Sequence, residues 1–167
     1  MAAKTWATAI MLLVAATASQ GRDQDRCRSA EVVDVPFQLQ SGRVISIDGK
    51  VGTADHQTII VDTGLYWTVI DRGLAQQLGL SGSGDSMLVT PNDVLTLPTV
   101  IIPELRVSSL VIRSLPAVVM DLMPFRERTK IQANVFLGMH VLTRSSATLD
   151  FAHSKLKFTL VHCTGSR

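Results

Sequence analysis

The fold of this chain is decided by residues 58–70, which read TIIVDTGLYWTVI. The first four residues are all β-branched, which is typical of a buried strand. Asp62 follows that strand directly, and burying a carboxylate is costly unless the group is paired or used. Thr63 offers a hydroxyl for hydrogen bonding, and Gly64 allows the backbone to turn tightly. Since Asp-Thr-Gly also occurs in ordinary turns, the triplet alone leaves a purely structural role for Asp62 open.

A second patterned stretch lies far downstream. Residues 134–138 read NVFLG, followed by VLT at 141–143 and ATLDF at 147–151. The apolar residues around Gly138 predict a short helix that begins after this glycine, and residues 147–151 and 156–161 predict two strands joined by a turn.

The two stretches together resemble the two signatures of the retropepsin-like aspartic proteases, over roughly residues 35–160. The resemblance implies a mainly β fold, a small closed acid-protease β-barrel with one or two short helices. It also implies that Asp62, Thr63 and Gly64 are catalytic. Pepsin-like enzymes carry two such triplets in a chain about twice this length. With one triplet, this chain is expected to act as a homodimer on a peptide or protein substrate.

The implied mechanism follows from the proximity of two copies of Asp62. Two close carboxylates cannot both ionise, so they share one proton. One then acts as general base on a bound water, while the other protonates the scissile carbonyl oxygen.

The residues after the triplet depart from the family. A small residue and two acidic positions, as in the retroviral proteases, are replaced by Leu65, Tyr66 and Trp67. The arginine that pairs with one of these acids is replaced by Met139. Because both partners are absent together, we expect Leu65, Tyr66 and Trp67 to form an apolar substrate-binding wall. Tyr66 and Trp67 could equally serve as core aromatics.

The family covers its substrate with a hairpin, and residues 87–102 are the candidate here. The turn would lie at Pro91, Asn92 and Asp93, and we expect Asn92 and Asp93 to contact substrate. This tip lacks glycine and would be stiff. Together with Leu65, it leaves two alternatives open: a catalytically inactive retropepsin-fold module for dimerisation or peptide binding, and a small barrel that binds an apolar ligand.

The N-terminus predicts export. Residues 1–18 contain Lys4, an apolar run at 6–16 and Ala-Thr-Ala at the end, the layout of a signal peptide. The run is shorter than the ~18 residues of a membrane span. We therefore expect a secreted or periplasmic protein with no stable membrane span after cleavage, an uncleaved anchor being the alternative. A flexible arm would occupy residues 19–31 and the protease domain residues 32–162.

The remaining composition narrows the choice of partners. The formal net charge of +2, with scattered Lys and Arg, argues against nucleic acid. In an oxidising compartment Cys27 and Cys163 predict a disulfide, within one chain or between two. The four histidines lack paired metal-ligand spacing, so we expect no metal or other cofactor.

Local patterns predict three further elements. Residues 68–80 approximate helical spacing, with Asp71 in the first turn and Gly79 as the stop. Residues 87–120 predict several short strands punctuated by prolines, and residues 123–130 predict a surface loop.

Overall fold

The structure, a computed structural model, describes residues 27–89, 94–143 and 145–163. The predicted signal peptide and most of the predicted arm lie outside this part of the chain. The described strands are β1 (Cys27–Pro36), β2 (Gln38–Gln40), β3 (Val44–Val51), β4 (Ala54–Val61), β5 (Thr68–Asp71), β6 (Gly82–Val89), β7 (Val94–Val107), β8 (Leu110–Met120), β9 (Ala133–Leu137), β10 (Ser146–Asp150) and β11 (Lys155–Cys163). The described helices are α1 (Arg72–Gln77), α2 (Met123–Thr129) and α3 (Met139–Leu142).

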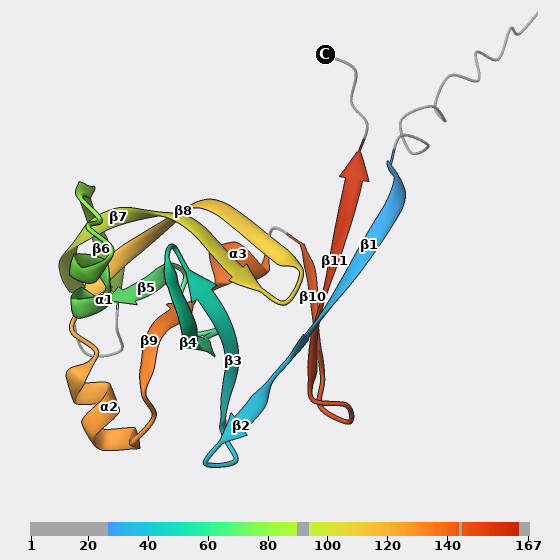
Figure 1. Cartoon of the computed structure of the whole chain (residues 1–167), viewed down its shortest axis with the longest axis horizontal. Coiled ribbons are helices and arrows are strands. Elements are labelled where there is room, and N and C mark those ends of the chain that lie inside the picture. Colours follow the sequence, from blue (N-terminus) through green and yellow to red (C-terminus); the bar gives the residue numbers. More distant parts are fainter. Residues whose placement is uncertain (1–26, 90–93, 144, 164–167) are drawn as a thin grey trace, which may run out of the picture.

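Strands of the larger sheet close into a ring. They pair in the order β3, β4, β9, β5, β8 and β7, and β7 pairs back onto β3, with Lys50 opposite Arg106 and Val51 opposite Leu105. β2 flanks β3, and β6 flanks β7. The prediction of a mainly β fold is confirmed, and Figure 1 shows the ring as the body of the molecule.

The core lies inside this ring, because each strand turns apolar side chains inward. Ile59, Ile70, Leu105, Leu115 and Leu137 are fully buried, and they come from five different strands. Burying a side chain of this size stabilises the fold by roughly 1.5–3 kcal/mol relative to leaving it exposed. The core therefore depends on contacts between segments that are distant in sequence.

Strand β9 lies between β4 and β5 and positions the loop that joins them. It runs parallel to β4, where Val61 pairs with Leu137, and antiparallel to β5, where Val69 pairs with Phe136. The loop at residues 62–67 therefore passes the end of β9. This arrangement brings the two patterned stretches of the sequence together.

A second, three-stranded sheet has the order β1, β11, β10 and extends to one side of the ring (Figure 1). β1 begins at Cys27, so part of the segment predicted as a flexible arm is a strand. The prediction was wrong there because β1 is stabilised by pairing with β11 at the far end of the chain. The strand register places Cys27 opposite Cys163.

Three local predictions were wrong, and the predicted place of Asp71 at a helix start was confirmed. Residues 68–71 form the fully buried strand β5, not a helical turn, because they pair with β8 and β9 on both sides. The helix begins later, at Arg72, with Asp71 as its N-cap as predicted. The predicted surface loop at residues 123–130 is mostly helix α2, with a proline in its first turn. The prolines in β7 and β8 do not divide these strands, which are longer than predicted.

Helix α2 is fastened to the ring by a buried ion pair. The Arg126 guanidinium donates to Asp71 Oδ1 at 3.0 Å and to the carbonyl of Ala133 at 3.1 Å. The side chains of Asp71 and Arg126 are only 8% and 16% exposed, so the pair is largely shielded from water. It therefore connects β5, α2 and β9.

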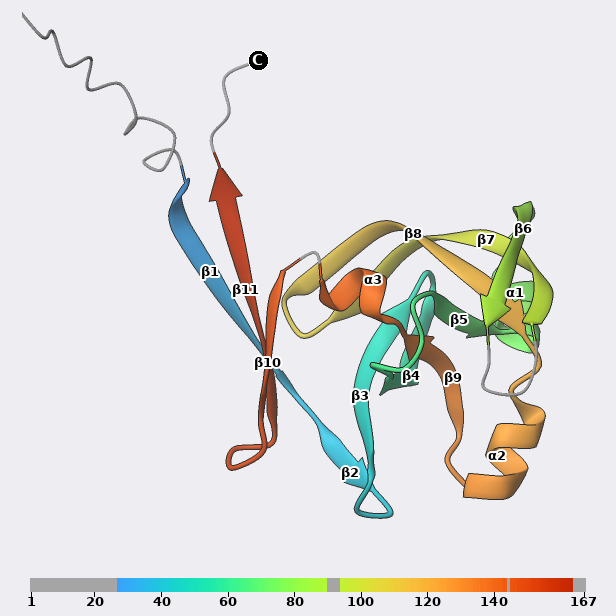
Figure 2. The ribbon, with the colours of Figure 1, turned by 180° about the vertical axis from the view of Figure 1, so that it is seen from behind.

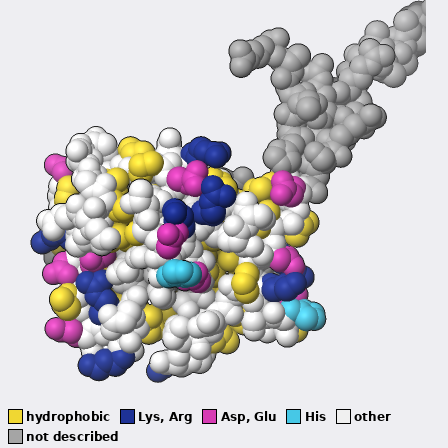
Figure 3. Space-filling model, viewed as in Figure 1, with side chains coloured by type: hydrophobic (Ala, Val, Ile, Leu, Met, Phe, Trp, Pro, Cys, Tyr) yellow, Lys and Arg dark blue, Asp and Glu magenta, His cyan; other side chains and the backbone are white. Residues whose placement is uncertain are grey.

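The surface of the described residues is mixed in charge. Figure 3 shows Lys and Arg side chains interspersed with Asp and Glu across the face in view. Among the described residues, no helix is long and apolar enough to cross a membrane.

Candidate active site

Asp62 stands at the point where the buried strand β4 ends. Its backbone N–H donates to the carbonyl of Leu137 at 3.0 Å, which continues the pairing of β4 with β9 by one residue. Its Oδ1 accepts a hydrogen bond from the N–H of Gly64 at 2.8 Å. The residue is half-buried. The carboxylate is therefore held by its own loop while remaining accessible.

The other two residues of the triplet are exposed. At Gly64, an added Cβ would lie 3.2 Å from Asp62 Oδ1, tighter than ordinary van der Waals contact. A glycine here lets the backbone approach the carboxylate closely enough to donate to it. Thr63 and Gly64 thus present an open surface next to Asp62.

A cavity of about 340 Å³ adjoins the triplet. Asp62 and Thr63 contribute to its wall, and most of the remaining lining is apolar. The lining residues are Arg43, Val44, Ile45, Ile60, Val61, Asp62, Thr63, Phe125, Phe136 and Leu149. A carboxylate beside an apolar recess is an arrangement that can place a side chain of a ligand next to a reactive group.

Two aromatic rings form part of this cavity. Phe125 of α2 and Phe136 of β9 meet edge to face, with ring centroids 4.8 Å apart and planes at 74°. Both side chains are half-buried. Sequence reasoning missed Phe125, because it lies in a charged stretch that was predicted as a loop. A proline in the first turn of α2 was the available signal of a helix start.

The predicted wall residues lie beside this cavity rather than in its lining. Leu65 and Trp67 are half-buried and pack against the same buried cluster as Leu97 of β7 and Phe136. Tyr66 is 63% exposed, and its ring meets that of Trp67 edge to face at 5.2 Å. The structure therefore places Leu65 and Trp67 in an apolar cluster that is continuous with the cavity through Phe136, and it turns Tyr66 outward.

The segment 65–67 is anchored by the start of α3. The N–H of Met139 donates to the carbonyl of Leu65 at 2.8 Å, and the N–H of His140 donates to that of Tyr66 at 3.0 Å. Just before the helix, a Cβ on Gly138 would lie 2.4 Å from the carbonyl oxygen of Trp67, which no side chain permits. The glycine of the second signature is therefore required by a close backbone approach.

The candidate flap is a hairpin, as predicted. β6 and β7 pair antiparallel from Gly82 opposite Val100 to Val89 opposite Val94. The turn between them, with the predicted contact residues Asn92 and Asp93, lies outside the described residues. On the β7 side Leu97 packs in the cluster with Leu65 and Trp67, which ties the hairpin to the candidate site.

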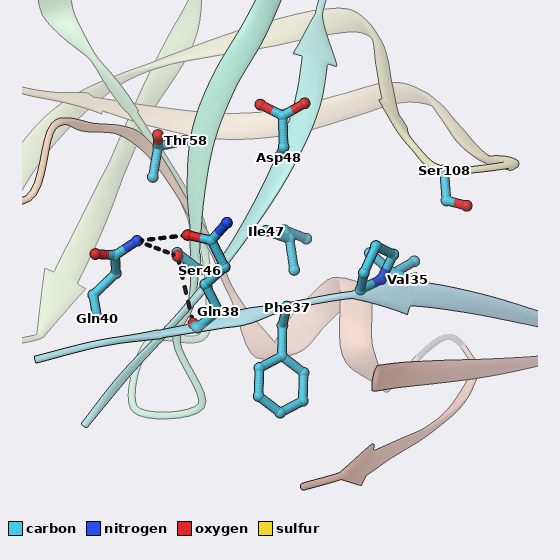
Figure 4. Close-up of a pocket in the computed structure, with 10 residues that line it drawn as sticks. Val35, Phe37, Gln38, Gln40, Ser46, Ile47, Asp48, Thr58 and Ser108 are labelled. Carbon is cyan, nitrogen blue, oxygen red and sulfur yellow. Dashed lines mark hydrogen bonds between the residues drawn. The ribbon is translucent and has the colours of Figure 1, made fainter. Parts of the chain in front are cut away.

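A larger cavity, of about 410 Å³, lies elsewhere, between β1, β2, β3 and the β7–β8 turn (Figure 4). Gln40 Nε2 donates to Gln38 Oε1 at 3.2 Å and to Ser46 Oγ at 3.1 Å within it. Asp48 is the acidic residue of its lining. Size alone does not make it the functional site, because a catalytic role needs a positioned reactive group. Among the described residues, no group of three or more His, Cys, Asp or Glu side chains could hold a metal ion.

Comparison with known proteins identifies the family. The model of the aspartyl protease family matches residues 44–141, which is more than half of the chain and includes the first signature and the start of the second. The chain belongs to the aspartyl protease family. The match extends from β3 to α3, so it contains Asp62, the candidate flap and Gly138.

Comparison with a solved structure confirms the predicted retropepsin-like fold. The chain is similar to a retropepsin-like aspartic protease from Rickettsia conorii, at 17% identity and a TM-score of 0.55, over 80% of this chain and 95% of that one. A likeness to the retroviral protease-like domain of Ddi1 from Leishmania major has 14% identity and a TM-score of 0.37, over 76% and 93% of the two chains, and carries no argument. None of the curated proteins compared with the chain matches it.

Proposed function

We propose that the protein is an exported aspartic endopeptidase whose catalytic dyad consists of Asp62 from each of two copies. The observation that carries this proposal is the position of Asp62. It lies at the end of a buried strand, in the loop that the family match includes, on the wall of a largely apolar cavity. The exposure of Thr63 and Gly64 leaves this edge accessible to a second copy.

The chemistry needs no covalent intermediate. One Asp62 carboxylate removes a proton from a bound water, and the water oxygen attacks the scissile carbonyl carbon. The other, protonated Asp62 donates its proton to the carbonyl oxygen, which yields a neutral tetrahedral diol. The first Asp62 then gives the proton that it gained to the amide nitrogen, while the second, now ionised Asp62 takes a proton from the diol. The C–N bond breaks, which releases an amine and a carboxylic acid and restores the shared proton. Thr63 from each copy would lock the two loops together, and Gly64 would contact the substrate backbone.

Cleavage of a mixed peptide library from pH 3 to 7 tests the activity. Wild-type protein is compared with Asp62→Asn and with wild type plus a pepstatin-type inhibitor. Acid-favoured cleavage that disappears in both controls supports the dyad. A folded dimer that cleaves nothing would instead favour the inactive dimerisation or peptide-binding module.

Mixing the two proteins tests the two-copy site. If wild type and Asp62→Asn exchange subunits freely, only dimers with two wild-type copies are active. Activity per wild-type subunit should then fall in proportion to the wild-type fraction of the mixture. Activity per wild-type subunit that stays constant would show that a single copy suffices.

We further propose that a large apolar side chain of the substrate enters the cavity beside Asp62. The facing rings of Phe125 and Phe136 support this preference. Phe125→Ala should enlarge the cavity and shift the kcat/KM ratio between peptides with aromatic and smaller aliphatic residues there, by roughly 10-fold. Phe151→Ala is the matched control, because Phe151 packs on Phe37 outside this cavity. An unchanged preference in Phe125→Ala, or a library profile that favours charged residues, would contradict the proposed substrate class.

Export and a disulfide complete the proposal. Residues directly opposite each other in an antiparallel pair have Cα atoms about 4.5–5.5 Å apart, which is within the range that disulfides span. The register of Cys27 with Cys163 therefore favours a bridge within one chain. Non-reducing peptide mapping of the exported protein should recover a disulfide between these two cysteines within one chain. The N-terminal residue of that chain should be Ser19. Free thiols or a covalent dimer would contradict the disulfide within one chain. A chain that still begins at Met1 would contradict cleavage of the signal peptide.

A further inference from the structure

Helix α3 contributes more to the candidate site than its two backbone hydrogen bonds. The first N–H groups of a helix have no partner within the helix. In α3, those of Met139 and His140 are accepted by the carbonyls of Leu65 and Tyr66, at 2.8 and 3.0 Å. Figure 2 shows α3 between the three-stranded sheet and β5, the strand that follows this loop. The loop after Asp62 is thus seated on the start of α3.

The side chain of His140 adds a third contact to the same segment. Its Nδ1 lies 2.9 Å from the carbonyl oxygen of Tyr66. A carbonyl oxygen only accepts hydrogen bonds, so Nδ1 must carry the proton in this contact. With the backbone N–H of His140 donating to the same oxygen, both of its lone pairs are used.

The imidazole is also enclosed by the residues that it holds. His140 is 6% exposed, and its ring centroid lies 5.5 Å from that of Trp67 and 6.0 Å from that of Tyr66. An apolar residue could fill this space, but it could not donate to Tyr66. A histidine therefore supplies a directional contact where packing alone would not require one.

We propose that His140 is a positioning residue, whose Nδ1–H fixes the segment with Tyr66 and Trp67 beside the cavity of the candidate active site. The effect on cleavage rests on the proposed protease function, whereas the effect on the segment does not. Because Asp62 is held separately through Leu137, the loss of the His140 donor should disturb substrate binding more than the chemical step.

The test uses the full chain with Trp6→Phe, which leaves Trp67 as its single tryptophan. Three variants are compared in this background. His140→Leu removes the donor and keeps an apolar side chain, whereas His140→Asn retains an N–H donor near the position of Nδ1. His153→Leu is the matched control, because His153 lies exposed in the turn between β10 and β11.

Two measurements report on the segment without any need for activity. In His140→Leu, the backbone N–H groups of residues 139 and 140, which donate to the carbonyls of Leu65 and Tyr66, should exchange with deuterium roughly fivefold faster. Acrylamide should also quench Trp67 emission more strongly. His140→Asn should restore values close to those of the parent chain, and His153→Leu should leave them unchanged. Equal behaviour of parent, His140→Leu and His140→Asn would overturn the proposal.

Folding and catalysis are separated by design. If His140→Leu does not fold, His140→Gln replaces it, because the longer side chain carries its donor past the position of Nδ1. Equal protection from deuterium exchange in His140→Asn and His140→Gln would then overturn the proposal. Where peptides are cleaved, His140→Leu should raise KM several-fold with kcat nearly unchanged, and a loss confined to kcat would overturn the positioning role. A parent chain that cleaves no peptide would contradict the proposed protease function, but not the effect of His140 on the segment.

Discussion

The ends of β4 and β5 carry two aspartates in nearly the same local sequence. Asp62 follows Thr-Ile-Ile-Val, and Asp71 follows Thr-Val-Ile. Asp71 is 6% exposed, and its carboxylate accepts from the N–H groups of Gly73, Leu74 and Leu122 and from the guanidinium of Arg126. Asp62 is half-buried, accepts from the N–H of Gly64 and borders a cavity.

The difference teaches how to separate a structural carboxylate from a candidate catalytic one. Every oxygen of Asp71 is occupied by donors from the helix that it caps and from α2, so the charge is compensated within the fold. Asp62 is held through one short loop contact and faces open space. The apolar runs before the two residues do not distinguish them, whereas their surroundings do.

The largest expected effect is on activity, from Asp62→Asn. The general base and its shared proton would be lost, so kcat/KM should fall by about 10³-fold or more. The amide keeps an oxygen for the N–H of Gly64, so the free energy of unfolding should change by less than ~1 kcal/mol. Peptide cleavage and urea unfolding check both values. A variant that unfolds readily would make Asp62 a structural residue like Asp71.

The reverse pattern is expected from Asp71→Asn. It leaves the buried guanidinium of Arg126 without its carboxylate, and breaking such a pair costs about 3–5 kcal/mol of unfolding free energy. Urea unfolding with the matched variant Arg126→Met locates the cost. Each single variant leaves one member of the pair without its partner. The double variant, Asp71→Asn with Arg126→Met, should therefore lose less unfolding free energy than the sum of the losses in the two single variants. Strict additivity would contradict the ion pair.

A steric change at Gly138 should affect both activity and stability. Gly138→Ala forces a Cβ against the carbonyl of Trp67, and the backbone must shift to relieve the contact. Such overpacking typically costs about 1–3 kcal/mol. Since the loop itself must move, activity should fall together with thermal stability. Gly42→Ala is the control in open space, although its φ of 69° adds backbone strain without touching the loop.

The smallest effect is expected at a third strand-end aspartate, Asp150 of β10. The ammonium of Lys157 donates to it at 2.8 Å and His153 contacts it at 2.9 Å, and these contacts hold the pKa of Asp150 well below its usual range. A lowered pKa stabilises the fold above the ordinary carboxyl value, and this contribution is lost as the pH falls toward the folded-state value. Asp150→Asn should therefore lower Tm slightly at both pH 7 and pH 5. The difference should shrink only below about pH 4, and a difference that grows there would contradict the sign.

Much of the site could be predicted because its signals are local. The apolar run before Asp62 predicts a buried strand, Gly138 predicts the start of a short helix, and Asp71 predicts a helix start. Each depends on the chemistry of a few neighbouring residues. Where residues 68–71 were predicted as helix, local spacing was overridden by pairing with β8 and β9, which no short window contains.

Helix α2 shows the same limit at the candidate site. Its stretch is charged and contains a proline, so it reads as a loop, yet the ion pair with Asp71 holds it against the ring. Phe125 lies in that helix, and its ring meets Phe136 at the cavity. Likewise, the role of His140 depends on a carbonyl far from it in sequence.

By itself, the sequence determined the mainly β class, the family resemblance and Asp62 as the candidate catalytic residue, because short apolar runs, turns and the two signatures are properties of neighbouring residues. Only the tertiary structure decided which aspartate stabilises the fold, which aromatic rings border the cavity and which contacts hold the loop beside Asp62. These outcomes depend on hydrogen bonds and packing between distant segments, and closure of the ring is the event that brings those segments together.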